Sequence, residues 1–279
     1  MPTAASPTTD VATLKEIARK ARINSIKMIT AAGSGHPGGS LSATDLMTTL
    51  LFREMRHDPK NPRWEDRDRF VLSKGHCIPA WYCLLADAGY FPESELMNLR
   101  RLGSPLQGHP DCTVLDSIEA CTGSLGQGLS IAIGIALAAR VAKRDYRVYC
   151  MVGDGEIQEG QVWEALLAAA KFKLDNLVVI LDNNKGQIDG PVAEVMPLEP
   201  ILDKIRAFNW HVIDINGHDY DQILSALDEA RTVQGRPVFI RADTIKGKGV
   251  SFMEGGIDWH GKAPKKEEME KAIAELEAA

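Results

Sequence analysis

Gly153-Asp154-Gly155-Glu156 is followed by Asn183-Asn184-Lys185, with 27 residues (156 to 182) between Gly155 and Asn183, and these two stretches decide the fold. The residues before them, YRVYCMV at 146–152 and NLVVILD at 176–182, are short apolar runs typical of buried parallel strands. The Ala- and Leu-rich segment QVWEALLAAAK at 161–171 is typical of a helix that crosses between two such strands. The sequence therefore predicts a strand–helix–strand unit with polar residues after both strands.

These polar residues could bind a divalent cation. Asp154 would supply negative charge, and Asn183 or Asn184 would supply a neutral oxygen. A backbone carbonyl near Gly186 could be a third ligand. Mg²⁺ and Ca²⁺ prefer oxygen ligands and often share them with phosphate groups, and a glycine-rich turn before a helix presents unpaired N–H groups to an anion. The pattern favours a site for a cation and a diphosphate over an ordinary turn in which Asp154 only caps a helix.

The composition indicates one α/β domain. The chain has 279 residues, of which 44% are hydrophobic, and its alternating patterns predict a parallel sheet with helices on both faces, spanning 1–279. Residues 1–10 are rich in Pro, Thr and Ala and are expected to be loose.

The net charge of −6 and the pI near 5.7 argue against a nucleic-acid-binding protein. No apolar run has the length of a membrane span and no signal peptide is recognisable, so we expect no membrane association and a cytoplasmic location.

The cysteines favour reduced thiols. They are Cys77, Cys83, Cys112, Cys121 and Cys150, and no two of them form a C-x-x-C pair. An odd number in a chain with a large core favours thiols that are mostly buried and unpaired. Cys77 and Cys83 lie in an apolar helical pattern, so we expect them in the core rather than in catalysis or metal binding.

Residue patterns predict the remaining elements. Asp10 is expected to cap a helix that runs to about Thr30, and 92–117 is expected to be an irregular loop at the active site. The segment 126–142 is apolar all round and rich in small residues, which predicts a buried helix. The other predicted helices are 43–52, 79–88, 200–208, 220–232 and 265–279, and the other predicted strands are 70–73, 210–215 and 237–244.

Four of the seven histidines lie in loops rich in Gly or Pro, namely His36, His76, His109 and His260. A single loop histidine is usually a surface residue, but glycine lets several loops crowd around one ligand, so four such positions favour a shared site. Histidine can donate to substrate hydroxyls and move protons near neutral pH. A zinc site is the alternative, and it is disfavoured because no two of these histidines are spaced i, i+4 on a helix and no carboxylate pattern joins them.

Together these motifs resemble the N-terminal, diphosphate-binding domain of transketolases. The G-D-G pattern followed by Asn-Asn is similar to the thiamine diphosphate motif, and further segments match in the order of that family between residues 34 and 261. They are SGHPG at 34–38, DRFVLSKGH at 68–76, QGHP at 107–110, TGSLGQG at 122–128 and WHG at 259–261. The resemblance covers almost the whole chain and implies the thiamine diphosphate-binding fold.

The resemblance implies roles for the residues at matching positions. His36, His76, His109 and His260 would line the channel to the reactive carbon of the cofactor, bind hydroxyls of a ketose and help to move protons. Glu159 would join a carboxylate network across a subunit interface. The residues in contact with thiamine diphosphate would be His76, Gly123, Ser124, Leu125, Gly153, Asp154, Gly155, Glu156, Asn184, Ile188 and His260, and the ligands of Mg²⁺ (or Ca²⁺ or Mn²⁺) would be Asp154, Asn184 and the carbonyl of Gly186.

Two departures from the family pattern bear on function. Gly186 stands where the family often has a larger apolar residue, which a carbonyl ligand tolerates. Nothing after residue 261 resembles the second domain of the family, which carries the glutamate that activates the aminopyrimidine. The resemblance therefore implies the N-terminal subunit of a two-chain transketolase, completed in an α₂β₂ assembly by a C-terminal subunit with a pyrimidine-binding domain. The reaction would be transfer of a two-carbon ketol unit from a ketose phosphate to an aldose phosphate.

Several alternatives stay open at this point. A related thiamine enzyme, such as a 1-deoxyxylulose-5-phosphate synthase or a ketol transferase for another sugar, would share the same half-site. The chain could also be a non-catalytic module for cofactor binding or assembly. A dinucleotide-dependent dehydrogenase is the weakest option, because no G-x-G-x-x-G follows the first strand. The Gly-Lys-Gly at 247–249 also lacks the form of a nucleotide loop, and we expect it to cover the diphosphate.

Overall fold

The computed structural model describes residues 10–278 and contains a five-stranded parallel sheet with the strand order β1-β2-β3-β7-β6. The strands are β1 (Arg69–Leu72), β2 (Val148–Gly153), β3 (Leu177–Asn183), β6 (His211–Asn216) and β7 (Val238–Asp243). Each one begins and ends within two residues of its predicted position. The prediction of a parallel α/β fold is confirmed.

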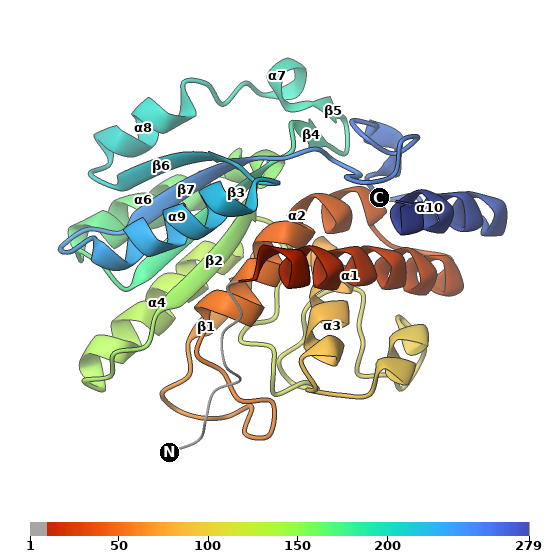
Figure 1. The fold of residues 1–279 in the computed structure, drawn as a ribbon. Helices are drawn as coiled ribbons and strands as arrows, with labels where there is room; N and C mark the ends of the chain where they lie inside the picture. The colour runs from red at the N-terminus through yellow and green to blue at the C-terminus, as the bar shows by residue number, and fades with distance from the viewer. Residues whose placement is uncertain (1–9, 279) are drawn as a thin grey trace.

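Helices cover both faces of the sheet (Figure 1). Alternate side chains of a strand point to opposite faces, so Val179 packs in one hydrophobic cluster and its neighbour Ile180 packs in the other. The helices of the first cluster are α4 (Gln127–Val141), α6 (Gly160–Lys171) and α8 (Ile201–Ala207). Those of the second are α1 (Val11–Ala32), α2 (Pro37–Thr49), α3 (Ile78–Asp87) and α9 (Tyr220–Thr232). The sheet is therefore buried between two helical layers.

The C-terminal helix α10 (Lys266–Ala278) lies beside α1, as Figure 1 shows, and buries Ala272 and Leu276 against it. The short elements are α5 (Asp154–Ile157), α7 (Val192–Val195), the antiparallel pair β4 (Gly186–Gln187) and β5 (Gly190–Pro191), and 3₁₀ turns at Gly75–Cys77, Glu93–Asn98 and Ile257–Trp259. In the stretch from residue 10 to residue 278, no helix has the length and apolar character needed to span a membrane.

The first helix begins and ends where local signals place it. The carboxylate of Asp10 accepts hydrogen bonds from the backbone N–H of Ala12 and of Thr13, at 3.3 Å and 3.0 Å, so the predicted cap is confirmed. Gly33 ends the helix in the left-handed conformation, with φ of 63°. Of the segment predicted to be loose, residues 1–9 lie outside the described part of the chain.

Two predicted helices were wrong in part. α2 begins at Pro37 rather than at residue 43, and it continues as a π-helical turn over Leu50–Glu54. Gly38 and Gly39 near the start of α2 allow close packing, since a Cβ on Gly39 would lie 2.6 Å from the Sγ atom of Cys77. α4 is not buried all round, because it leaves Ile131 and Val141 exposed in this chain.

Candidate active site

The ends of β2, β3 and β7 meet around one pocket, which encloses about 70 Å³. The carboxyl edge of an open α/β sheet is the usual place for a ligand site. Most residues predicted to contact the cofactor or metal lie in its wall: His76, Leu125, Gly153, Asp154, Gly155, Glu156, Asn184, Gly186, Ile188 and His260. Ser124, which is exposed, and Gly123 lie in the turn before α4 and are not part of this wall. The structure thus brings together segments that are far apart in the sequence.

Asp154 is a buried carboxylate without a cationic partner. Its side chain is 2% exposed, and it forms no ion pair within residues 10–278. Its oxygens accept hydrogen bonds from the backbone N–H groups of Gly155 and Lys185. Burial, together with the charge of Asp182, raises the pKa of Asp154 to about 6. A divalent cation at this carboxylate would compensate the buried charge, so the residue fits a metal ligand.

The structure separates the two asparagines of the motif. Asn184 is buried and lines the pocket, whereas Asn183 donates from Nδ2 to Asp243 outside it. The Nδ2 of Asn184 donates to Ser42 and to Asp182, at 3.2 Å and 3.3 Å. These bonds occupy the donor end of the amide. Its oxygen accepts a hydrogen bond from the backbone N–H of Gly186 at 3.2 Å and keeps a second lone pair for a cation. Asn184 is therefore the better candidate ligand of the two.

The third candidate ligand is the carbonyl of Gly186. It accepts a hydrogen bond from Nζ of Lys246 at 2.9 Å, and its second lone pair can still bind a cation. A Cβ at position 186 would lie 2.7 Å from Cδ1 of Ile257 and 3.1 Å from Cδ of Lys246. Ile257 thus occupies the space that a larger residue at 186 would need, which explains the departure from the family pattern at this position.

A buried ion pair lies beside these residues, and its Lys74 also lines the pocket. Lys74 and Asp182, 1% and 0% exposed, lie in direct contact, and Asp182 also accepts hydrogen bonds from Ser42 and Thr244. Burial alone would lower the pKa of Lys74, but the charge of Asp182 holds it above its ordinary value. Because Lys74 pairs with Asp182, it forms no ion pair with Asp154 or with Glu156, the other buried acid of the pocket wall, within residues 10–278.

The four loop histidines lie close together at the pocket. The ring of His36 lies 5.1 Å from that of His76, 5.7 Å from that of His260 and 6.1 Å from that of His109, measured between centroids. His76 and His260 are 5.2 Å apart and face the pocket. The predicted shared site is thus formed from three loops and a 3₁₀ turn. The Nδ1 atom of His36 is buried and has no hydrogen-bond partner in the described part of the chain, so it is open to a ligand.

All four histidines are neutral near pH 7. Burial, and then the charge of Arg100, lowers the pKa of His36 to about 4. Burial and Lys246 lower the pKa of His260 to about 3. The same causes act on the other two, since burial and Lys74 hold the pKa of His76 well below its ordinary value, and burial and Arg100 lower that of His109. Neutral imidazoles can both donate and accept hydrogen bonds, which suits proton movement.

The two candidate glutamates differ in their surroundings. Glu156 is buried, and its carboxylate accepts hydrogen bonds from Ser73 and from the backbone N–H of Gly126 and Gly153. It ties the end of β2 to the start of α4, so its carboxylate positions the pocket wall. Glu159 is exposed and lies against Gly126, whose Cβ would be 2.8 Å from the Cβ of Glu159. Its predicted interface role stays a prediction.

Sequence reasoning missed Lys246 as a site residue. Its side chain is 2% exposed, lines the pocket, and contacts Nδ1 of His260 at 2.9 Å. Burial, followed by the charge of Lys74, lowers the pKa of Lys246 to about 8. The sequence feature that could have identified it is a lysine in a Gly-rich segment after a strand. From that position an ammonium group can reach the carboxyl edge of the sheet.

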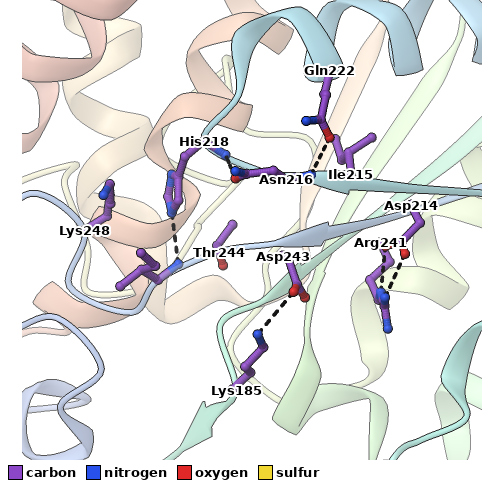
Figure 2. Close-up of a pocket in the computed structure, with 11 residues that line it drawn as sticks. Lys185, Asp214, Ile215, Asn216, His218, Gln222, Arg241, Asp243, Thr244 and Lys248 are labelled. Carbon is purple, nitrogen blue, oxygen red and sulfur yellow. Dashed lines mark hydrogen bonds and ion pairs between the residues drawn. The ribbon is translucent and has the colours of Figure 1, made fainter.

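A second, larger pocket of about 520 Å³ lies at the same edge, beyond the ends of β6 and β7 (Figure 2). Its charged side chains are paired with one another or with nearby acids. Arg241 donates to both carboxylate oxygens of Asp214 at 2.8 Å, and Lys185 lies 3.1 Å from Asp243. His218 bonds to Asp45 behind the pocket. None of the predicted site residues lines it.

Comparison with known proteins finds transketolases and transketolase subunits. A 6-deoxy-6-sulfo-D-fructose transketolase subunit of Clostridium sp. (strain MSTE9) is 49% identical, over 88% of this chain and 89% of that protein. An apulose-4-phosphate transketolase subunit of Phocaeicola vulgatus is 41% identical, over 95% of this chain and 94% of that protein. Human transketolase is 44% identical over 94% of this chain, which spans 42% of the human protein.

Solved structures show the same fold. The crystal structure of transketolase from Campylobacter jejuni superposes with a TM-score of 0.92 at 37% identity, over 96% of this chain and 43% of that one. Residues 13–277 match the family model described as the transketolase, thiamine diphosphate binding domain. The chain therefore belongs to the family of transketolase N-terminal, thiamine diphosphate-binding domains.

Proposed function

We propose that this chain is the N-terminal subunit of a two-chain transketolase, which moves a two-carbon ketol unit from a ketose phosphate to an aldose phosphate. The observation that carries the proposal is the meeting of a buried, unpaired Asp154 with a cluster of neutral histidines in one pocket. Relatives that are named as subunits, and that match over nearly their whole length, support the two-chain form.

The residues that follow β2 and β3 would hold the cofactor and its cation. Asp154, Asn184 and the carbonyl of Gly186 would bind Mg²⁺ (or Ca²⁺ or Mn²⁺), which in turn binds the diphosphate. Lys246 would face the same diphosphate, and that anion would compensate its buried charge. When bound, thiamine diphosphate supplies a carbon nucleophile that takes up and releases the two-carbon unit.

The histidines would bind the sugar and move its protons. His76 and His260 face the pocket, and His36 and His109 extend the cluster outward. Because they are neutral, they would bind hydroxyl groups of the ketose and pass protons to and from its oxygens. The open Nδ1 of His36 offers one such hydrogen bond without breaking another.

A partner subunit would complete the site. The pocket encloses about 70 Å³ in this chain, whereas ligand sites usually enclose roughly 300–1,000 Å³. We propose that a C-terminal subunit with a pyrimidine-binding domain covers it and supplies the glutamate that activates the aminopyrimidine. The exposed face of α4, with Ile131 and Val141, is a candidate contact in an α₂β₂ assembly. A cytoplasmic location also remains part of the proposal.

The relatives differ in the sugar for which they are named. One relative is named for 6-deoxy-6-sulfo-D-fructose and another for apulose-4-phosphate. A ketol transferase for a variant sugar is therefore the second candidate, and a panel of ketose donors and aldose acceptors separates it from an ordinary transketolase.

The test uses the purified chain with and without a purified C-terminal subunit. Calorimetry measures binding of thiamine diphosphate in the presence of Mg²⁺, and a coupled assay measures ketol transfer. We expect transfer only with both chains and both cofactors present. Full transfer by this chain alone would contradict the two-chain form, and cofactor binding without any transfer would favour a non-catalytic module.

A further inference from the structure

Two exposed cysteines lie next to each other in the loop between the histidine cluster and α4. The Sγ atoms of Cys112 and Cys121 are 3.3 Å apart. The other three cysteines, Cys77, Cys83 and Cys150, are buried. Since a disulfide bond is about 2.05 Å long, an approach of about 1.3 Å would join the exposed pair.

The backbone already holds the two sides of this loop together. The N–H of Thr122 donates to the carbonyl of Pro110 at 3.3 Å, and the hydroxyl of Thr122 donates to the carbonyl of Leu72 at 2.7 Å. The bond between Thr122 and Pro110 closes the base of the loop, one residue after Cys121 and two residues before Cys112. The two cysteines therefore meet because the fold places them there.

Side chains on the loop keep the pair accessible and aligned. The carboxylate of Asp111 accepts hydrogen bonds from the N–H and the hydroxyl of Thr113, at 2.8 Å and 2.6 Å, and lies 3.5 Å from the Sγ of Cys121. Ile118 and Ala120 are buried and anchor the far side of the loop in the core. The loop is thus held at its base and in its middle, while the two thiols face solvent.

We propose that Cys112 and Cys121 form a reversible disulfide by exchange with a small-molecule disulfide such as oxidised glutathione. One cysteine thiolate attacks the glutathione disulfide, which breaks its S–S bond and releases one glutathione thiol. The second cysteine then attacks the mixed disulfide and releases the second glutathione. Two protein thiols are oxidised to one disulfide, one glutathione disulfide is reduced to two thiols, and the two protons pass to the released thiolates.

The bond would stiffen the segment that joins two parts of the candidate site. His109 lies on one side of the loop and Gly123 on the other, and a Cβ on Gly123 would lie 3.0 Å from the ring of His109. A covalent link between Cys112 and Cys121 would therefore restrict relative motion of the histidine and the turn before α4. The formation of this link does not depend on the proposed ketol transfer.

The test treats the folded full chain with oxidised glutathione, alkylates the free thiols and digests with trypsin. Residues 102–140 form one tryptic peptide that holds Cys112 and Cys121 and no other cysteine. We expect this peptide to lose two hydrogens, to resist alkylation, and to recover both thiols in dithiothreitol. Stable glutathione adducts on this peptide, links between chains, or a link that forms only after denaturation would overturn the proposal.

Variants separate the pair from the other thiols. Cys112→Ser and Cys121→Ser each leave one exposed thiol, so each variant is expected to stop at a mixed disulfide with a single glutathione. The matched control is Cys83→Ser, which removes a buried thiol and should still form the internal link. Hydrogen exchange of the wild-type chain, reduced and oxidised, is expected to show slower exchange at 122–126 after oxidation. Unchanged exchange would overturn the stiffening.

Discussion

Two pockets lie side by side at the carboxyl edge of the same sheet, and they differ in how their charges are balanced. In the larger pocket, beyond β6 and β7, Arg241 pairs with Asp214 and Lys185 pairs with Asp243 (Figure 2). In the smaller pocket, Asp154 is buried without a cationic partner among residues 10–278. Lys246 is buried there against a carbonyl and a neutral histidine.

The difference indicates that a buried charge without a partner identifies a ligand site better than the volume of the pocket does. A buried charge costs free energy unless something compensates it. In the larger pocket the protein compensates its own charges, so a ligand would have to break existing pairs. In the smaller pocket a cation and a diphosphate would complete pairs that the chain leaves open. Substitutions in and behind the two pockets test this contrast, from the largest expected effect to the smallest.

The largest effect is expected from Asp154→Asn. The substitution removes the charged ligand of the proposed cation, so we expect the affinity for thiamine diphosphate with Mg²⁺ to fall more than 100-fold, since even residues behind metal ligands contribute roughly 10–100-fold. Calorimetry with the wild-type and variant chains measures this. The matched control is Asp243→Asn in the larger pocket, where we expect no change in cofactor affinity. Equal losses of cofactor affinity in both variants would contradict the proposed difference between the two pockets.

The same variant is expected to change how the stability of the chain without cofactor depends on pH. The pKa of Asp154 is raised to about 6 by burial, above its ordinary value of 3.8. The folded state therefore binds a proton more tightly than the unfolded state, and this contribution to stability is fully present below about pH 4 and is lost as the pH rises through about 6. Thermal melts from acid to mildly alkaline pH should show this slope in the wild type, and Asp154→Asn should flatten it. A pH slope that is the same in the variant as in the wild type would contradict the assignment.

Local sequence patterns predicted the floor of the smaller pocket because it depends on neighbouring strands. β2 and β3 pair directly, so the residues after them, Asp154 and Asn184, must come close in any parallel arrangement. The Gly- and Pro-rich loops around the four histidines predicted a shared site, and the family resemblance implied the channel that they would line. The pairing of Lys74 with Asp182 joins residues 108 positions apart, and no local pattern reports such a contact. The start of α2 was missed for the same reason, because its glycines serve contacts with distant residues.

The next substitution lies behind the larger pocket. Asp45 is 5% exposed and accepts hydrogen bonds from Arg22, His218 and Tyr220. Asp45→Asn would leave Arg22 buried without its acid, so we expect the free energy of unfolding to fall by about 3–5 kcal/mol, as for other broken buried pairs. Urea denaturation measures this. Asp203→Asn, in an exposed pair with Arg206, is the control and should change stability by less than about 0.5 kcal/mol. A loss of similar size in both variants would show that burial of the pair is not the cause.

The stability that Asp45 contributes should also depend on pH. Burial would raise the pKa of Asp45, but Arg22 and His218 hold it well below its ordinary value. The contribution is therefore present above about pH 4 and is lost as the pH falls towards the folded-state pKa. Its sign is opposite to that of Asp154, so the two groups can be separated by melts of the two variants across the same pH range.

A smaller effect is expected from Arg100, which lies outside the pocket wall. It donates to the hydroxyl of Ser34 at 2.9 Å, and its charge lowers the pKa of His36 and of His109. Arg100→Gln should raise both pKa values, so we expect the acid limb of the pH–activity profile of the two-chain enzyme to move to higher pH. Activity at neutral pH should fall only several-fold. Arg100→Lys keeps the charge and should keep the limb in place, and Arg101→Gln is the control for an exposed neighbour.

The smallest effect is expected from Arg241→Gln in the larger pocket. The guanidinium pairs with Asp214 and with Glu199, at 2.8 Å and 3.0 Å, and both acids are exposed to solvent. Pairs of this kind contribute about 1 kcal/mol or less and are screened by salt. We therefore expect a small loss in urea denaturation at low salt, no loss at high salt, and unchanged affinity for thiamine diphosphate. A tenfold loss of cofactor affinity or of ketol transfer would show that a pocket with balanced charges also serves the reaction, and the contrast between the two pockets would then fail.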